Sequence, residues 1–267
     1  MKRIWFIGID ISKKTLDVFI YNPKAKTSKK HFQVENQEKG FKKMFQVIKK
    51  QKIILDETFI CLEYCGVYGF ELGMFLEGKV NYCFCNPLHI KRSLGLTRGK
   101  NDKIDAFKIA RFSYLFREEL KPTKLPSKTL VQLKALMAER KRVTKAIVVE
   151  KQVIKELKLV LSKSSYKRSE DRLTSLKSDL KMIEKEIETI IFSDEEIKRN
   201  YLLVRTVTGF GLVNTVMMIL CSNNFEGINN PRSFACYCGI APFEYKSGTS
   251  IRGATRVSPF ANKQMKS

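Results

Sequence analysis

The sequence predicts an α/β protein in which a mixed β-sheet with helices on both faces is followed by a long helical hairpin and a small, mostly helical third region. Strand-like runs dominate the N-terminal part and then alternate with helical patterns. Residues 127–191 are highly charged and lack Gly and Pro, which favours long helices. With 267 residues, 43% of them hydrophobic, the chain can bury a substantial core in two or three domains.

Three apolar runs near the N-terminus predict the first strands. Residues 3–10 end in Asp10, as expected of a strand that is buried on both faces and whose tip reaches solvent. The runs 15–21 and 29–35 follow, with the turn-forming Asn22-Pro23-Lys24 between them. Because the connections are short, we expect an antiparallel meander.

Helices and strands then alternate. Residues 38–50 carry apolar side chains at helical spacing among lysines, which predicts an amphipathic helix with a basic outer face. An apolar strand is predicted over 58–63, a helix over 67–77 and a strand over 80–85. This order favours a mixed sheet covered on both faces.

Residues 101–106 predict a helix start with two carboxylates on one face. Asp102 and Asp105 are three residues apart, so they can point at one spot. Asn101 is a suitable N-cap. The apolar stripe behind these acids is expected at Ile104, Phe107, Ala110 and Tyr114.

A basic, glycine-punctuated loop is predicted over residues 91–100, just before that helix. It is suited to a phosphate backbone, and its candidate nucleic-acid contacts are Lys91, Arg92, Arg98 and Lys100. The alternative is an acidic first turn favoured by the helix dipole, with a solvated basic loop before it.

Four carboxylates that are remote in sequence could meet at one sheet edge. Asp10 and Glu63 end their predicted strands, where ligands gather in open α/β sheets, and Asp102 and Asp105 begin a helix. Like charges at short range cannot all stay ionised without compensation. We therefore expect two Mg²⁺ ions, with Mn²⁺ as the alternative, because hard cations prefer carboxylate oxygen and leave positions open for phosphate.

The charge balance predicts a polyanionic partner. Fifty Lys and Arg against 27 Asp and Glu give a net charge of +23, and each part of the chain is basic. Nucleic acid is the expected partner. An anionic membrane is the competing explanation, but the aliphatic runs are too short to span a bilayer. The N-terminal apolar run meets Asp10 before it can serve as a signal peptide, so we expect a cytoplasmic protein.

The seven cysteines are expected to be buried free thiols. Their spacing contains no C-x-x-C pair, and the chain has only two histidines, which argues against a structural zinc site. Paired disulfides do not suit a cytosolic chain.

The chain changes character at Pro122 and Pro126, which predicts domains over 1–121, 122–199 and 200–267. Helices are expected over 127–161 and 166–191. The second carries leucines and isoleucines in alternating steps of three and four, which predicts an antiparallel coiled-coil hairpin. The alternative is a rigid spacer with a solvated basic face.

The third region offers two candidate phosphate contacts. The turn Gly209-Phe210-Gly211 opens a helix and could present backbone N–H groups to a phosphate, although it is equally suited to a simple tight turn. Residues 239–253 read as a basic loop in which Ser247, next to glycine, could act as a nucleophile. The nearby cations are Lys246, Arg252 and Arg256. The alternative is that this loop only contacts phosphate.

Three motifs stand out, namely Ile7-Gly8-Ile9-Asp10-Ile11-Ser12-Lys13-Lys14, Glu63 in Leu-Glu-Tyr-Cys-Gly-Val-Tyr-Gly, and Asn-Asp-Lys-Ile-Asp-Ala at 101–106. They resemble motifs of the DEDD transposases of the IS110 family of insertion sequences, which include pilin-gene invertases. The resemblance implies a RuvC-like ribonuclease-H fold for the first domain. It places a metal-binding catalytic tetrad on Asp10, Glu63, Asp102 and Asp105. It also implies a coiled coil used in assembly and a C-terminal transposase domain whose Ser-Gly motif carries the nucleophile. Ser247 matches that serine, with Ser250 and Ser258 as the alternatives.

The resemblance further implies a transposase and site-specific DNA recombinase guided by a bridge-type noncoding RNA. Its partners would be double-stranded donor and target DNA, and its dimers would pair into tetramers with composite sites, on the nucleoid of a bacterium. The chain departs from the family around residues 257–262, which lack the expected basic residue and glycine, and it stops at Ser267 where members continue, so we expect a shortened copy. The rivals are a RuvC-like metal-dependent endonuclease without a covalent intermediate and an inactive nucleic-acid-binding remnant.

Overall fold

The computed structural model describes residues 3–24, 30–95, 101–228, 230–247, 251–257 and 261–266. The chain divides into two compact units, residues 1–125 and 126–267, and each is described by itself. The division into three domains, with boundaries after residues 121 and 199, stays a prediction. Within the described ranges, every helix is too short or too polar to cross a membrane.

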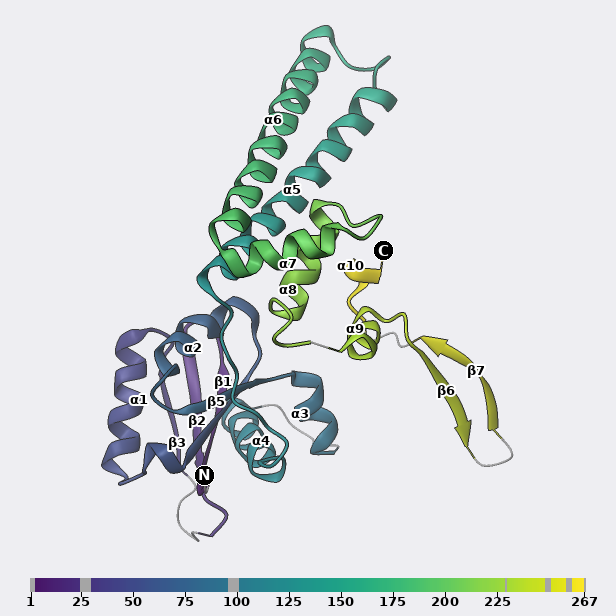
Figure 1. Ribbon diagram of the computed structural model, residues 1–267. Helices are drawn as coiled ribbons and strands as arrows, with labels where there is room; N and C mark the ends of the chain where they lie inside the picture. The colour runs from purple at the N-terminus through teal and green to yellow at the C-terminus, as the bar shows by residue number, and fades with distance from the viewer. Residues whose placement is uncertain are drawn as a thin grey trace. The chain divides into compact units, whose positions relative to one another are not determined.

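A five-stranded mixed sheet forms the centre of the first unit, with the strand order β3-β2-β1-β4-β5 (Figure 1). β1 (Trp5–Ile11), β2 (Thr15–Tyr21) and β3 (Lys30–Glu35) are antiparallel neighbours. β4 (Thr58–Glu63) and β5 (Asn81–Cys85) continue the sheet parallel to β1. The predicted mixed sheet with an N-terminal meander is therefore confirmed.

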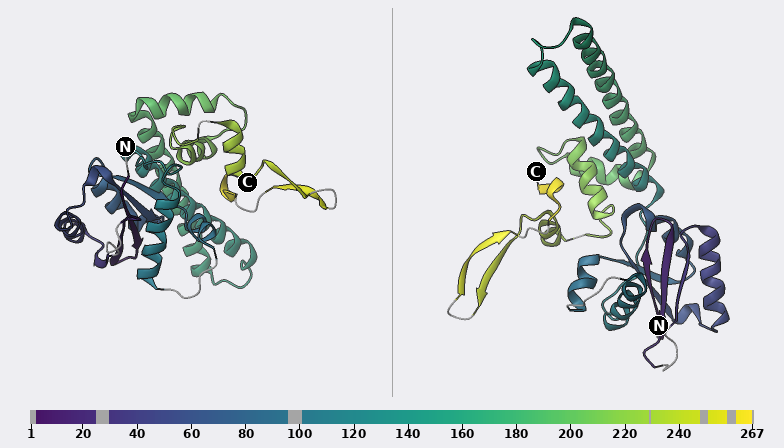
Figure 2. Two further views of the ribbon diagram at one scale, coloured as in Figure 1. Left: turned by 90° about the horizontal axis from the view of Figure 1, so that it is seen from below. Right: turned by 180° about the vertical axis from the view of Figure 1, so that it is seen from behind.

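Helices cover both faces of this sheet (Figures 1 and 2). α1 and α2 pack on one face, and α3 and α4 pack on the other. The bounds of the helices and 3₁₀ turns are α1 (Glu38–Lys50), η1 (Leu55–Glu57), η2 (Gly66–Gly69), α2 (Phe70–Leu76), α3 (Pro87–Ser93) and α4 (Asp102–Leu115).

The start of the predicted basic loop is helical instead. α3 includes Lys91 and Arg92, because Asn86 caps it by accepting a hydrogen bond from the Leu88 N–H at 2.8 Å and Pro87 occupies its first turn. These two signals were present in the sequence, but the glycine and charge pattern that follows them favoured a loop.

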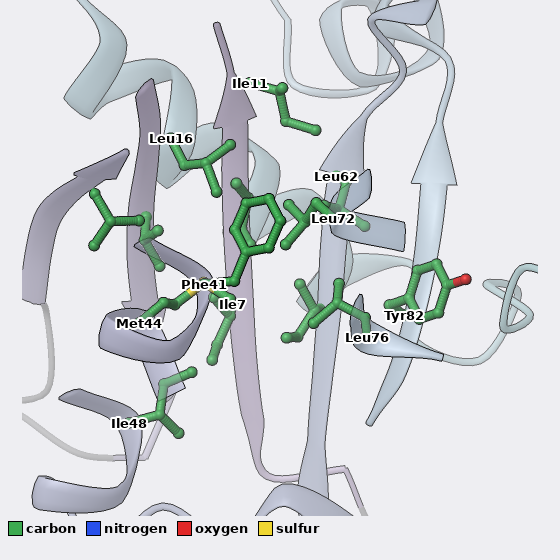
Figure 3. Close-up of a cluster of buried hydrophobic side chains, with 14 of the residues drawn as sticks. Ile7, Ile11, Leu16, Phe41, Met44, Ile48, Leu62, Leu72, Leu76 and Tyr82 are labelled. Carbon is green, nitrogen blue, oxygen red and sulfur yellow. The ribbon is translucent and has the colours of Figure 1, made fainter. Parts of the chain in front are cut away.

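One core lies between the sheet and the helices α1 and α2. Phe41, Met44 and Ile48 of α1 share this core with Leu72 and Leu76 of α2, and Figure 3 shows Phe41 beside Leu72. The strands contribute alternate residues to this face, namely Ile7, Ile9, Ile11, Leu16, Val18, Ile20, Ile60 and Leu62. Each fully buried side chain of this kind contributes roughly 1.5–3 kcal/mol, so this core is a main source of the unit's stability.

The other face is defined by the close approach of α4 to β1. A Cβ atom built at Gly8 would lie less than 3.0 Å from the Ala106 carbonyl oxygen and the Ala110 amide nitrogen, so the backbones are in contact. The predicted stripe of α4 is wrong at Ile104, which is 43% exposed. The side chains that α4 buries are Ala106, Ile109, Ala110, Phe112 and Ser113. Small residues lie at the contact because a larger side chain would hold the helix away from the sheet.

The second unit consists mainly of helices. Its elements are α5 (Lys128–Glu156), α6 (Lys163–Ser193), α7 (Glu195–Arg205), α8 (Leu212–Ser222), α9 (Pro231–Cys238), β6 (Pro242–Ser247), β7 (Ile251–Val257) and α10 (Lys263–Lys266). α5 and α6 lie side by side (Figure 1), with Ile183, Ile187 and Ile191 of α6 in a shared core. Arg140 and Glu184 join the two helices by an ion pair of 2.7 Å. The assignment of this pair as a coiled coil used in assembly stays a prediction.

The predicted C-terminal loop contains a β-hairpin. β6 and β7 pair antiparallel, with Lys246 opposite Arg252 and Ser247 opposite Ile251 (Figure 2). Aromatic and β-branched residues at alternate positions of both segments favour strands. The expectation of a loop over residues 239–253 is therefore wrong for the two strands.

We predict that Gly8→Ala destabilises the protein by at least about 1–3 kcal/mol, because backbone atoms of α4 cannot move away from the new methyl group as a side chain can. Urea unfolding monitored by circular dichroism measures this. Gly73→Ala is the matched control, since its Cβ would meet the Phe84 and Leu125 side chains at 3.2 and 3.3 Å and the helix gains propensity. Equal stability of the Gly8→Ala variant and the wild type would contradict the proposed contact.

Candidate functional site

Two carboxylates end neighbouring parallel strands. Ile9 of β1 pairs with Leu62 of β4, so Asp10 and Glu63 take the next positions on strands that run about 4.8 Å apart. Side chains alternate along a strand, and Asp10 therefore shares the face of Gly8, where α4 packs. Both acids are half-buried.

The first turn of α4 brings two further carboxylates to Asp10. Because Ala106 contacts Gly8, the preceding turn of the helix extends along β1 toward Asp10. The predicted cap is present, since the Asn101 side chain accepts a hydrogen bond from the Lys103 N–H at 3.0 Å. Asp105 is half-buried and Asp102 is exposed, and the charges of both act on Asp10.

The pKa of Asp10 is raised above its ordinary value. Burial is the largest cause, and the negative charges of Asp102, Asp105 and Asp17 add to it, while the backbone N–H of Ile11 opposes the rise. The charges of three neighbouring acids therefore act on Asp10 and are incompletely balanced. Such a group suits a hard cation, which accepts carboxylate oxygens as ligands and removes the repulsion.

Glu63 reaches the same region from the neighbouring strand. Burial raises the pKa of the Cys65 thiol, and the charges of both Asp10 and Glu63 contribute to that rise. Both strand-end acids therefore lie close enough to Cys65 for their charges to affect its pKa. The end of β4 is held to β5 by the Tyr64 N–H, which donates to the Cys85 carbonyl oxygen at 2.9 Å.

Asp17 is a fifth acid that the sequence analysis missed. It lies directly opposite Asp10 in the β1–β2 pair and is only 4% exposed. Its carboxylate contacts His31 Nε2 at 2.8 Å and accepts a hydrogen bond from Gln33 Nε2 at 2.9 Å. A lone acid inside an apolar strand was the available signal, because a buried carboxylate requires partners.

Lys108 is the second missed residue. Its Nζ atom lies 2.8 Å from Asp105 Oδ1, with both side chains largely buried. This ion pair balances one charge of the acidic group. The i, i+3 spacing of acid and base on a predicted helix was the available signal.

The predicted basic contacts are only partly within the described residues. Lys91 and Arg92 are exposed on α3. Arg98 and Lys100 lie outside the described residues, as do Ser250 and Ser258.

Ser247 is the last residue of β6, and Arg252 lies in β7. Their roles as nucleophile and phosphate contact stay predictions. Lys246 is exposed and pairs with Glu244 at 3.1 Å. Arg256 is exposed on β7, opposite Phe243.

The glycine turn before α8 lines a pocket within the second unit. Gly209 has a φ of +91°, which favours glycine, and Arg205 holds the turn by donating from Nη1 to the Phe210 carbonyl oxygen at 2.9 Å. The pocket has a volume of about 650 Å³. Its lining combines Gly209 and Gly211 with the cations Arg140, Lys181 and Lys185 and the acids Glu184 and Glu188. The first backbone N–H groups of α8 are available to an anion there.

Comparison with known families identifies the class of this protein as a transposase. Residues 7–163 match the family model of the DEDD transposases of IS110, and residues 201–267 match that of the transposase IS116/IS110/IS902 family. The chain belongs to the IS110 family of transposases.

One curated relative and two solved structures are similar to parts of the chain. The transposase for insertion sequence element IS1533 of Leptospira borgpetersenii is 33% identical over 118 residues, which are 44% of this chain and 33% of that protein. The match thus spans about a third of the relative's length. Two structures of T. thermophilus RuvC, one in complex with a Holliday junction substrate, align with 45% and 44% of this chain and with 100% and 98% of theirs. Their identities are 13% and 14%, and their TM-scores are 0.34 and 0.32.

We predict that, with a chelator present, the wild type loses stability relative to Asp10→Asn as the pH rises from about 4 to 7. The folded-state pKa of Asp10 is raised, so the folded chain binds this proton more tightly than the unfolded chain, and the advantage disappears as Asp10 ionises. Urea unfolding at a series of pH values gives the difference in the free energy of unfolding. Asp56→Asn, at an exposed acid of the same unit, should show no such trend. An Asp10→Asn variant that is less stable than the wild type at neutral pH would contradict the proposed repulsion at Asp10.

Proposed function

We propose that this chain is a DNA transposase that cuts and rejoins DNA through a serine nucleophile, assisted by divalent metal held by four carboxylates. Family membership supports the activity class. The observation that carries the proposal is the gathering of Asp102 and Asp105 over Asp10, beside the end of the strand that carries Glu63.

The carboxylates suit Mg²⁺ in chemistry and charge. It would be held by Asp10, Glu63, Asp102 and Asp105, since all four offer hard oxygen donors. The pKa of Asp10 is raised first by burial and then by neighbouring negative charges, and a cation would relieve that repulsion. When bound, Mg²⁺ or Mn²⁺ stabilises negative charge on phosphate oxygens and leaves positions open for them.

The chain's own residues orient this group. The ion pair with Lys108 fixes the Asp105 carboxylate. Hydrogen bonds from His31 and Gln33 fix the carboxylate of Asp17, which lies opposite Asp10. Lys91 and Arg92 would bind the DNA backbone close to the helix that carries the acids. A pre-positioned site of this kind avoids the cost of ordering side chains when DNA binds.

Ser247 would supply the nucleophile. Its hydroxyl oxygen attacks a DNA phosphorus, forming a phosphoserine bond while the bond from phosphorus to a deoxyribose oxygen breaks. The serine proton passes to solvent, and the leaving oxygen takes up a proton as a free hydroxyl end. Because one phosphoester replaces another, the reverse attack by a second DNA end rejoins strands without ATP.

We propose assembly into dimers and tetramers on the basis of the family resemblance. The carboxylates belong to the first compact unit and Ser247 to the second, so composite sites with groups from two protomers are available to dimers and to tetramers built from them. The α5–α6 pair is our candidate for the coiled-coil contact between protomers. We further propose guidance by a bridge-type noncoding RNA that pairs with donor and target DNA, and action on the bacterial nucleoid, both of which rest on the family resemblance.

DNA contact is supported by charge. The chain carries a net charge of +23, which is the observation that supports contact with a polyanion. Such contacts position a backbone without reading sequence, so binding should weaken steeply with salt.

We predict a covalent adduct between the chain and DNA that contains the element ends, formed with Mg²⁺ and the cognate RNA. Ser247→Ala should abolish it, because the alcohol that attacks phosphorus is missing. Denaturing gels with end-labelled DNA detect the adduct, and mass spectrometry locates it. Ser250→Ala and Ser258→Ala are the matched controls. An adduct that survives Ser247→Ala and is lost in one of these controls would reassign the nucleophile, and cleavage without any adduct would favour the endonuclease.

We predict that Asp10→Asn, Glu63→Gln, Asp102→Asn and Asp105→Asn each reduce metal-dependent cleavage by at least about 100-fold, because each removes a carboxylate that would hold the cation. DNA binding, measured by anisotropy at several salt concentrations, should remain within about threefold of the wild type, since phosphate contacts dominate affinity. Asp56→Asn should cleave normally. Salt-dependent binding without cleavage by the wild type, under Mg²⁺ or Mn²⁺, would identify an inactive nucleic-acid binder.

A further inference from the structure

Three cysteines that the proposed function does not use converge on neighbouring strands. Cys61 lies on β4 opposite Cys83 of β5, and Cys85 is two residues further along β5 on the same face. The exposed fractions of these side chains are only 0%, 3% and 5%. They lie in the core that α3 and α4 form on the sheet.

The three sulfur atoms are grouped like ligands of one ion. The Sγ atoms of Cys61 and Cys85 are 3.2 Å apart, those of Cys83 and Cys85 are 3.4 Å apart, and all three lie within 4.8 Å of one another. These contacts are hydrogen bonds, in which the Cys61 thiol donates to Cys85 and a second bond joins Cys83 and Cys85. An ion bonded to each sulfur at about 2.3 Å would hold the sulfurs roughly 4 Å apart, so the thiols need to separate by less than 1 Å.

We propose that Cys61, Cys83 and Cys85 form a binding site for a divalent thiophilic metal ion of the Zn²⁺ class. Thiolate sulfur selects such ions over Mg²⁺, so this site is chemically distinct from the carboxylate group. Three protein ligands leave one position of a tetrahedral ion for a small ligand such as water.

Charge supports a divalent ion at this depth. Three thiolates and one divalent ion leave a single negative charge, and the guanidinium of Arg3 lies close enough to Cys83 for their charges to interact. Arg3 is held in place by hydrogen bonds to the carbonyl oxygens of Arg117 and Leu120 and by stacking 4.0 Å from the centre of the Phe59 ring. The buried group would therefore be close to neutral, whereas a monovalent ion would leave an uncompensated charge.

The position of the cluster gives the ion a structural role. Cys61 precedes Glu63 by two residues, and Cys85 pairs with Glu63 across the two strands. A bound ion would tie β4 to β5 directly behind the strand end that presents Glu63. Each thiol would release its proton to solvent on binding, so the apparent affinity should rise with pH.

The test is a titration of the full chain, purified under reducing conditions without metal, with Cd²⁺ as the probe. We expect one tightly bound Cd²⁺ per chain, thiolate-to-cadmium charge-transfer absorption in the ultraviolet, and a rise in the melting temperature. Cys83→Ala and Cys85→Ser should weaken binding by more than the 10–100-fold typical of losing a residue that only supports a ligand. Cys236→Ala, on α9, is the matched control and should bind like the wild type.

A second measurement locates the ion without relying on a folded variant. In mild urea, Cd²⁺ should slow alkylation of the wild-type chain at Cys61, Cys83 and Cys85, and leave Cys236 unaffected, as mapped by mass spectrometry. The proposal is overturned if the folded, reduced wild type shows no charge-transfer band. It is equally overturned if the band persists in the folded Cys83→Ala variant, or if protection falls on other cysteines. None of these readouts requires DNA cleavage.

Discussion

The contact between α4 and Gly8 is the constraint on which the acidic site depends. No side chain separates the helix from β1 at this point, so the first turn of α4 is held directly over the end of the strand. Because position 8 is a glycine, the backbone of α4 approaches β1 closely enough for the charges of Asp102 and Asp105 to act on Asp10.

Electrostatics opposes this arrangement, and the fold compensates only in part. Lys108 neutralises Asp105, and His31 and Gln33 satisfy Asp17, but the raised pKa of Asp10 shows that burial and repulsion remain. Incompletely balanced charge is common at ligand-binding sites, because ligand binding then regains free energy that was lost on folding. The strongly positive chain around this group attracts the polyanion on which we propose it acts.

Much of the fold could be predicted because local pattern and tertiary packing agreed. The strand 15–21 and the helix 38–50 have the bounds that their periodicity predicted, and Asn101 caps α4 as expected. Prediction failed where a distant contact set the outcome. The exposure of Ile104 reflects the approach of α4 to the sheet, and the strands of the C-terminal hairpin stabilise each other across a connection that resembled a plain loop.

The sequence by itself determined the candidates for the chemistry: its motifs indicated the four acids and the serine, and the positive charge indicated a polyanionic partner. Only the tertiary structure decided what lies beside them. Asp17 meets Asp10 through strand register, and Cys61 meets Cys83 and Cys85 in the same way, although no spacing in the sequence suggested a cluster. The physical reason is that periodicity reports which face a residue takes within its own element, whereas register between elements depends on packing that no single segment contains.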